Sequence, residues 1–85
     1  MTDFATALAA LPEGSFHGTA NGRRYIVTKS SYAKGKSIKL VADELGGNDY
    51  ISLNWYVLAT VDLLRSCEMP ETKVRAFVDA LVPDG

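Results

Sequence analysis

The sequence has very little cysteine and histidine, with one residue of each among its 85, Cys67 and His17. A single cysteine excludes a disulfide within the chain and a metal site built from several cysteines. The sequence also lacks any run of about 18 uncharged apolar residues, which excludes a membrane-spanning helix. Its first segment, MTDFATALAALPEG, carries an acidic residue and no early basic one, unlike a secretory signal. We therefore expect a cytoplasmic protein that uses no membrane, metal or cofactor.

Apolar residues make up 47% of the sequence and charged residues 22%, a balance typical of a chain that buries one compact core. At this length the sequence predicts a single small domain over residues 1–85, with a radius of gyration of about 12 Å. Two large lobes around a deep cleft are excluded. A core of this size gives marginal stability, so dimerisation is one expected way of burying more surface.

Positive charge is unevenly distributed along the sequence, although the formal net charge is only −1. The overall balance excludes the bulk basicity common among nucleic-acid-binding proteins. Between Gly14 and Ala42, however, the sequence has no acidic residue and six basic ones: Arg23, Arg24, Lys29, Lys34, Lys36 and Lys39. Such a segment predicts either a surface that attracts a polyanion or solvated strand residues that discourage pairing with other chains.

Hydrophobic spacing and turn residues predict the secondary structure. Phe4, Leu8 and Leu11 recur at the spacing of one helix face, and Asn21-Gly22 favours the tight turn of a β-hairpin. Apolar and polar residues alternate in the segments that follow, as they do in strands. Pro70 is typical of a first helical residue. The expected elements, in chain order, are a helix over 2–11, a hairpin over 15–32, strands over 36–45 and 50–59, a strand or extended segment over 62–67, and a helix from Pro70 to Val82.

The order of these elements predicts an α+β fold of the form α-β-β-β-β-α. Short connections make consecutive strands antiparallel, so three or four strands should pair as a meander. Both terminal helices should pack on one face of this sheet, which is a stable two-layer arrangement. The face that they cover should carry Ile38, Leu40, Ile51, Leu53, Trp55 and Val57.

The strand over residues 50–59 carries the clearest functional signal. Tyr50, Ser52, Asn54 and Tyr56 alternate with its apolar residues, so they should face away from the helices. Tyrosine rings stack on unpaired bases, and neighbouring Lys and Arg side chains neutralise phosphates. The same side chains also suit a protein interface in which two sheets meet face to face. The candidate binding residues are Arg23, Arg24, Lys29, Lys34, Lys36, Lys39, Tyr50, Asn54 and Tyr56.

These features favour a small non-enzymatic binding module that works through the exposed face of its sheet. The first hypothesis is protein interaction or homodimerisation, and the alternative is binding of single-stranded nucleic acid. An enzyme is not expected, because neither His17 nor Cys67 sits in a catalytic motif. The tripeptide Gly35-Lys36-Ser37 lacks the earlier glycine of a phosphate-binding loop and precedes a strand instead of a helix.

Consecutive strands followed by a helix that begins at a proline resemble the PUR repeat and related modules that bind single-stranded DNA. The shared features are the Tyr25-Ile26-Val27 strand, the strand that begins at Gly35-Lys36-Ser37-Ile38, and the helix from Pro70 to Val82. The resemblance covers about 60 residues and is one of architecture. It implies a sheet that faces nucleic acid and a helix that supports dimerisation. The sequence departs from such binders in its acidic pI of about 5.7.

Overall fold

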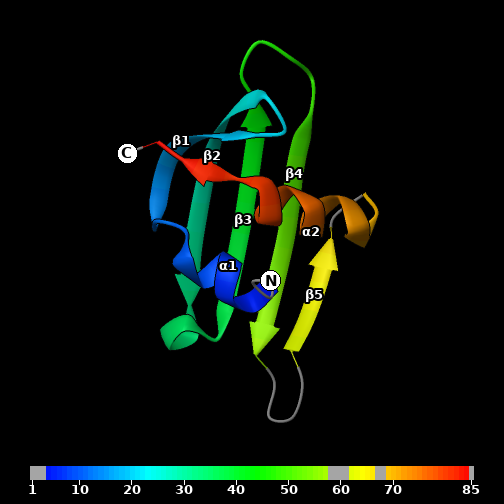
Figure 1. Cartoon of the computed structure of the whole chain (residues 1–85). Helices are drawn as coiled ribbons and strands as arrows, with labels where there is room; N and C mark the ends of the chain where they lie inside the picture. Colours follow the sequence, from blue (N-terminus) through cyan, green and yellow to red (C-terminus); the bar gives the residue numbers. More distant parts are fainter. Residues whose placement is uncertain (1–3, 58–61, 67–68, 85) are drawn as a thin grey trace.

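A computed structural model of the chain describes residues 4–57, 62–66 and 69–84 (Figure 1). Within these residues the two α-helices and the first five strands follow the predicted order, and the Cα radius of gyration is 12.2 Å, close to the predicted value. The elements are α1 (Phe4–Ala10), β1 (Gly14–Ala20), β2 (Arg23–Tyr32), a short 3-10 helix η1 (Ala33–Gly35), β3 (Ser37–Glu44), β4 (Tyr50–Val57), β5 (Asp62–Ser66), α2 (Glu71–Ala80) and β6 (Val82–Pro83).

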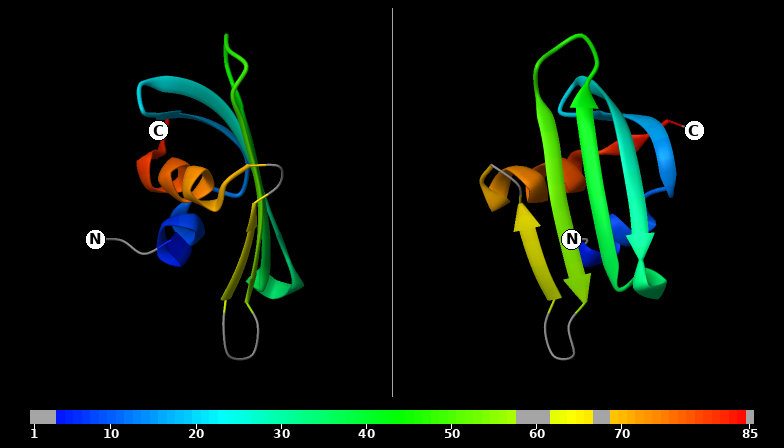
Figure 2. Two further views of the ribbon diagram at one scale, coloured as in Figure 1. Left: turned by 90° about the vertical axis from the view of Figure 1, so that its right-hand side faces the viewer. Right: turned by 180° about the vertical axis from the view of Figure 1, so that it is seen from behind.

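The described strands form one antiparallel sheet in the order β5-β4-β3-β2-β1-β6. Strands β1 to β4 each pair with the next one along the chain, so β1 to β5 make a meander, and β6 adds to the edge next to β1. Figure 2 shows α1 and α2 on the same side of this sheet, while the described residues leave the other side uncovered. The α+β class and the one-sided helices are confirmed. The sheet has six strands, more than the three or four predicted.

The sixth strand comes from a segment that the sequence predicts to be helical. Helix α2 ends at Ala80, Leu81 is extended with φ −68° and ψ 127°, and Val82 pairs with Thr19 of β1. Val82 is 65% exposed and does not join the core. Gly18 permits this close packing, because a Cβ there would lie 2.8 Å from Cδ1 of Leu81. A two-residue strand has no alternation of its own, so only the pairing with β1 identifies it.

The β1–β2 turn is the one that the sequence predicts. Asn21 and Gly22 both have positive φ, 53° and 78°, which a two-residue type I′ turn requires. The turn places Ala20 opposite Arg23 and so fixes which residues of the two strands share a face. Pro70 is the N-cap residue of α2, so this helix begins one residue later than predicted.

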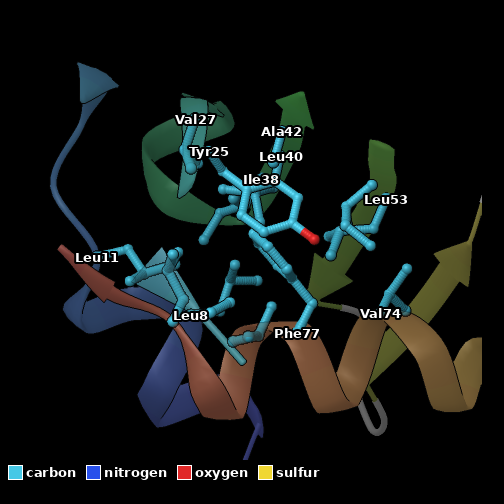
Figure 3. Packing of buried hydrophobic residues seen from close by; sticks show 14 of the residues in the cluster. Leu8, Leu11, Tyr25, Val27, Ile38, Leu40, Ala42, Leu53, Val74 and Phe77 are labelled. Atoms are coloured by element: carbon cyan, nitrogen blue, oxygen red, sulfur yellow. The ribbon is translucent and has the colours of Figure 1, made fainter. Parts of the chain in front are cut away.

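The core lies between the sheet and the two helices (Figure 3). Cross-strand register places Val27, Ala42 and Ile51 side by side on the helix-covered face. Leu8 of α1 and Val74 of α2 close the core from the helix side and are fully buried. The predicted core residues Ile38, Leu40, Ile51, Leu53 and Trp55 are all buried, which confirms the predicted face, while the side chain of Val57 lies outside what the structure describes.

Three side chains fasten α2 to the sheet near the β1–β2 turn. Asp49, directly before β4, accepts a hydrogen bond from Nζ of Lys73 at 2.6 Å and another from the Tyr25 hydroxyl at 2.9 Å. Donation by Lys73, and then by Tyr25, lowers the pKa of the Asp49 carboxyl. Burial, together with the hydrogen bond to Asp49, raises the pKa of the Tyr25 hydroxyl. The fold therefore favours an ionised Asp49 beside a protonated Tyr25.

Acid should weaken this attachment. Because the folded-state pKa of Asp49 lies below the ordinary aspartate value of about 3.9, its ionised form stabilises the fold above that pH. This contribution should be lost as the pH falls through the lowered pKa. In urea titrations over about pH 2–6, the unfolding free energy of Asp49→Asn should decline less steeply than that of the wild type, with Tyr25→Phe in between. Equal slopes for the three proteins would contradict the role given to the carboxylate.

Candidate binding surface on the uncovered sheet face

The side of the sheet opposite to the helices, named here the open face, carries the polar residues of β4. Tyr50 is 40% exposed, and Asn54 and Tyr56 are half-buried. They alternate with the buried Leu53 and Trp55, so their side chains leave the sheet on the open face. The right-hand view of Figure 2 has the open face toward the viewer, with both helices beyond the sheet. The predicted orientation of the strand is confirmed.

At the end of the sheet near η1, aromatic and cationic residues lie in two neighbouring rows across the strands. One row holds Lys39 and Arg65, on either side of β4. The next row holds Tyr32 and Tyr56, on either side of β3. Strands lie about 4.8 Å apart, so the two members of each row are separated by about 10 Å. These four residues are named the aromatic–cationic end of the open face.

The cationic side chains differ in whether they form an ion pair with a described carboxylate. Four form ion pairs: Arg23 with Glu44, Arg24 with Asp84, Lys73 with Asp49, and Arg75 with Glu71. Four others have no described carboxylate within ion-pair distance: Lys34, Lys36, Lys39 and Arg65. Two of these lie at the β2–β3 turn and two on the aromatic–cationic end. Positive charge is therefore left uncompensated at this end of the sheet among the side chains that the structure describes.

Lys29 lies apart from the other predicted binding residues. It sits on the helix-covered face of β2 and is only 4% exposed. Its ammonium donates to the backbone carbonyls of Leu8, Ala9 and Leu11 at 2.9, 3.1 and 2.8 Å, where α1 ends. Burial lowers the pKa of Lys29, and the Glu13 carboxylate opposes this change. The expectation that Lys29 faces a partner is corrected: its donors are used to hold α1.

Arg23 and Arg24 lie at the opposite end of the sheet from Lys39. The Arg24 guanidinium donates to Oδ1 of Asp84 at 2.8 Å and to Oδ2 at 2.6 Å. These hydrogen bonds raise the pKa of Arg24 and lower that of Asp84. Arg23 has its nearest ion-pair carboxylate, Glu44, at 3.9 Å. The structure therefore does not join the predicted arginines and lysines into one cluster.

The middle of the open face mixes apolar and hydroxyl side chains. Ile26 and Val41 are half-buried diagonal neighbours on β2 and β3. Thr28 and Ser52 flank Val41 in the register, and the exposed Tyr50 lies farther along β4. Such a mixed surface is more polar than the core of an obligate protein interface.

Three features considered for catalysis or phosphate binding can now be placed. His17 lies exposed on β1, and Cys67 is outside the described residues. The Gly35-Lys36-Ser37 segment leads into β3, so it does not have the helix that follows a phosphate-binding loop. Over residues 4–57, 62–66 and 69–84, no group of three histidine, cysteine or carboxylate side chains is placed to hold a metal ion.

Two residues of the aromatic–cationic end, Tyr32 and Arg65, are not among those predicted from the sequence. Tyr32 continues the alternation of Thr28 and Ser30 along β2, so its face can be read from the hairpin pattern. The face of Arg65 depends on the register that pairs it with Asn54. That register cannot be read from the sequence, because it is known only from the pairing of β5 with β4 in the structure.

No known protein family, curated protein or solved structure matches the chain. The resemblance to the PUR repeat therefore receives no support beyond the order of elements. None of the helices in the described part of the chain has the length and apolar character needed to cross a membrane. The function must be inferred from the geometry of this chain alone.

Proposed function

We propose that this protein is a non-enzymatic binding module that holds single-stranded nucleic acid on the open face of its sheet. The proposal is carried by one observation: Lys39 and Arg65, which have no ion-pair partner among the described carboxylates, adjoin two tyrosine rings at the aromatic–cationic end. The remaining cations are ion-paired or, in the case of Lys29, buried. This distribution favours a polyanionic partner at one end of the sheet.

Stacking and charge neutralisation come from different rows of the aromatic–cationic end. Tyr32 and Tyr56 offer rings to two bases about 10 Å apart. Lys39 and Arg65 lie one row away, about 7 Å along the strands, where they can contact the phosphates that connect those bases. Because every base has a flat face, stacking of this kind binds single strands with little sequence preference.

The formal net charge of −1 does not oppose this proposal. Attraction of a polyanion depends on the local potential, and a molecule with segregated charge can attract it on one side only. The acidic residues Glu44, Asp49, Glu71 and Asp84 are already offset by their own cations. Four of the ten acidic residues are therefore already paired with cations that lie away from the positive end of the sheet.

Protein interaction or self-association through the middle of the open face is the second candidate. The half-buried Ile26 and Val41 favour it, because two sheets packed face to face would bury these apolar groups. A small core also gains from additional buried surface. This candidate predicts a dimer in sedimentation experiments that becomes a monomer in the Val41→Lys variant.

Neutralising two cations should weaken the binding of a single-stranded oligonucleotide. For fluorescently labelled oligothymidine, the logarithm of the affinity should fall with the logarithm of the salt concentration by about 0.7 for each phosphate contact. A variant with both Lys39→Gln and Arg65→Gln should reduce this slope by about 1.4.

Tyr56→Ala should lose about 1–3 kcal/mol of binding free energy, the contribution of one stacked base. Fluorescence anisotropy measures each of these quantities.

Arg24→Gln is the matched control, because it removes a cation that Asp84 already holds. Its affinity for oligothymidine should stay within about twofold of the wild type. Binding that does not respond to salt, or a double variant that binds as tightly as the wild type, would contradict the proposal. A dimer that is lost in Val41→Lys, together with no oligonucleotide binding, would favour the second candidate.

A further inference from the structure

A cavity of about 340 Å³ lies between α2 and the sheet, on the helix-covered side. The β1–β2 turn bends over the same side (Figure 2, left), and Asn21 and Arg23 line the cavity from there. Helix α2 contributes Lys73, Ala76 and Phe77. The sheet separates this cavity from the open face, so a ligand here would not compete with a nucleic acid there.

The floor of the cavity is apolar and aromatic. Ile51 is buried, and Phe77 meets Tyr25 edge-on, with ring centroids 4.8 Å apart and an interplanar angle of 77°. Figure 3 shows the Phe77 and Tyr25 side chains approaching each other from helix and sheet. Small-molecule sites range over about 300–1,000 Å³, so this cavity suits a ligand with a single ring system.

The lining of the cavity includes two cations, Arg23 and Lys73, and one carboxylate, Asp49, while Glu44, the ion-pair partner of Arg23, lies outside the lining. Both carboxylate oxygens of Asp49 accept a hydrogen bond, one from Lys73 and the other from Tyr25. Arg23 is 59% exposed, and its Nη1 lies 3.9 Å from Glu44, too far for a hydrogen bond. Lysine has three N–H donors and arginine five, so Arg23 and Lys73 retain donors for an incoming anion.

We propose that this cavity binds a small aromatic carboxylate, with its ring on Ile51 and Phe77 and its carboxylate between Arg23 and Lys73. The two cations select the sign of the ligand, because charge-assisted hydrogen bonds are about twice as strong as neutral ones. A ring with an ammonium group would instead meet two like charges and a single lining carboxylate, Asp49, whose two oxygens already accept hydrogen bonds. This site goes beyond the proposed nucleic-acid binding and does not depend on it.

Benzoate and phenylacetate are direct probes of the cavity, and benzamide and phenylacetamide are their neutral counterparts. In two-dimensional amide NMR spectra of the full chain, the carboxylates should produce saturable shifts at Arg23, Asp49 and Lys73. The signal of Lys39, on the open face, should not move. The neutral amides should bind about tenfold more weakly, since they lose the charge-assisted hydrogen bonds.

Two substitutions on α2 separate occupancy of the cavity from a general effect on the helix. Ala76→Leu fills the cavity from an exposed position and should abolish the shifts, whereas Thr72→Leu, one turn away and outside the lining, should leave them unchanged. Arg23→Gln should weaken the carboxylates about tenfold without affecting the neutral amides. Unchanged unfolding midpoints would show that these variants are folded. Equal binding of benzoate and benzamide, no saturable shift at the cavity, or full binding by Ala76→Leu would overturn the proposal.

Discussion

Replacing Phe77 by alanine should lower the free energy of unfolding by about 3–5 kcal/mol, the usual cost of truncating a buried phenylalanine. The Phe77 side chain is 4% exposed and packs edge-on against Tyr25 between α2 and the sheet. Its removal loses this contact and leaves a void that the surrounding side chains only partly refill. Urea denaturation followed by the fluorescence of Trp55, the single tryptophan, measures the loss.

Tyr56→Ala is the matched control for Phe77→Ala, because it removes an aromatic ring from the other side of the sheet. Tyr56 is half-buried on the open face, so its truncation should cost less than about half as much. An equally large loss for the two variants would mean that the open face is covered in solution. If the loss of unfolding free energy in Tyr56→Ala grew with protein concentration, a second copy of the chain would be what covers the open face.

The Lys29→Met variant should lose about 2–4 kcal/mol of stability, although methionine keeps much of the length and the apolar stem of lysine. The substitution removes the donor shared by the carbonyls of Leu8, Ala9 and Leu11. The contacts to Leu8 and Leu11 are buried, so water cannot replace the ammonium there. Helix α1 has only seven residues and is marginal by itself, which makes it depend on this attachment. Urea denaturation and faster amide exchange in α1 would report the loss.

Lys39→Met provides the same chemical change at an exposed lysine on the neighbouring strand β3. Lys39 pairs with Ser30, the residue next to Lys29, but lies on the opposite face. Its substitution should change the unfolding free energy by no more than about 0.5 kcal/mol. If Lys29→Met were as stable as Lys39→Met, the result would show that apolar contacts alone hold α1 against the sheet and would contradict the role given to Lys29.

The two faces of the sheet could be predicted because the alternation in β4 is unbroken. Ile51, Leu53 and Trp55 alternate with the polar residues Ser52 and Asn54, so a slip of one position would expose every one of these apolar side chains. The Asn21-Gly22 turn could be predicted for a different reason, because few residues tolerate its positive φ angles. Local patterns of this kind were enough to place Tyr50, Asn54 and Tyr56 on the open face.

The distribution of ion pairs could not be predicted, because it depends on residues that are distant in the sequence. Arg24 finds its partner, Asp84, 60 residues later. Lys29 shares the phase of Val27 along β2, yet lysine is rarely buried, and its acceptors belong to a separate helix. The basic segment therefore looks uniform in the sequence, and only the fold divides it into ion-paired cations, one buried cation and cations with no described carboxylate partner.

Over the residues that the structure describes, the outermost strands of the sheet are also its shortest. Strands β5 and β6 have five and two residues, whereas β2 and β3 in the interior have ten and eight. On the β6 side, Gly18 and Thr19 are paired with β6 and the carbonyl of His17 accepts the Asp84 amide, which leaves only short stretches of β1 open. A neighbouring chain that tried to extend the sheet sideways would find few backbone groups in line. Fibril growth is thereby disfavoured at the β6 margin of the sheet.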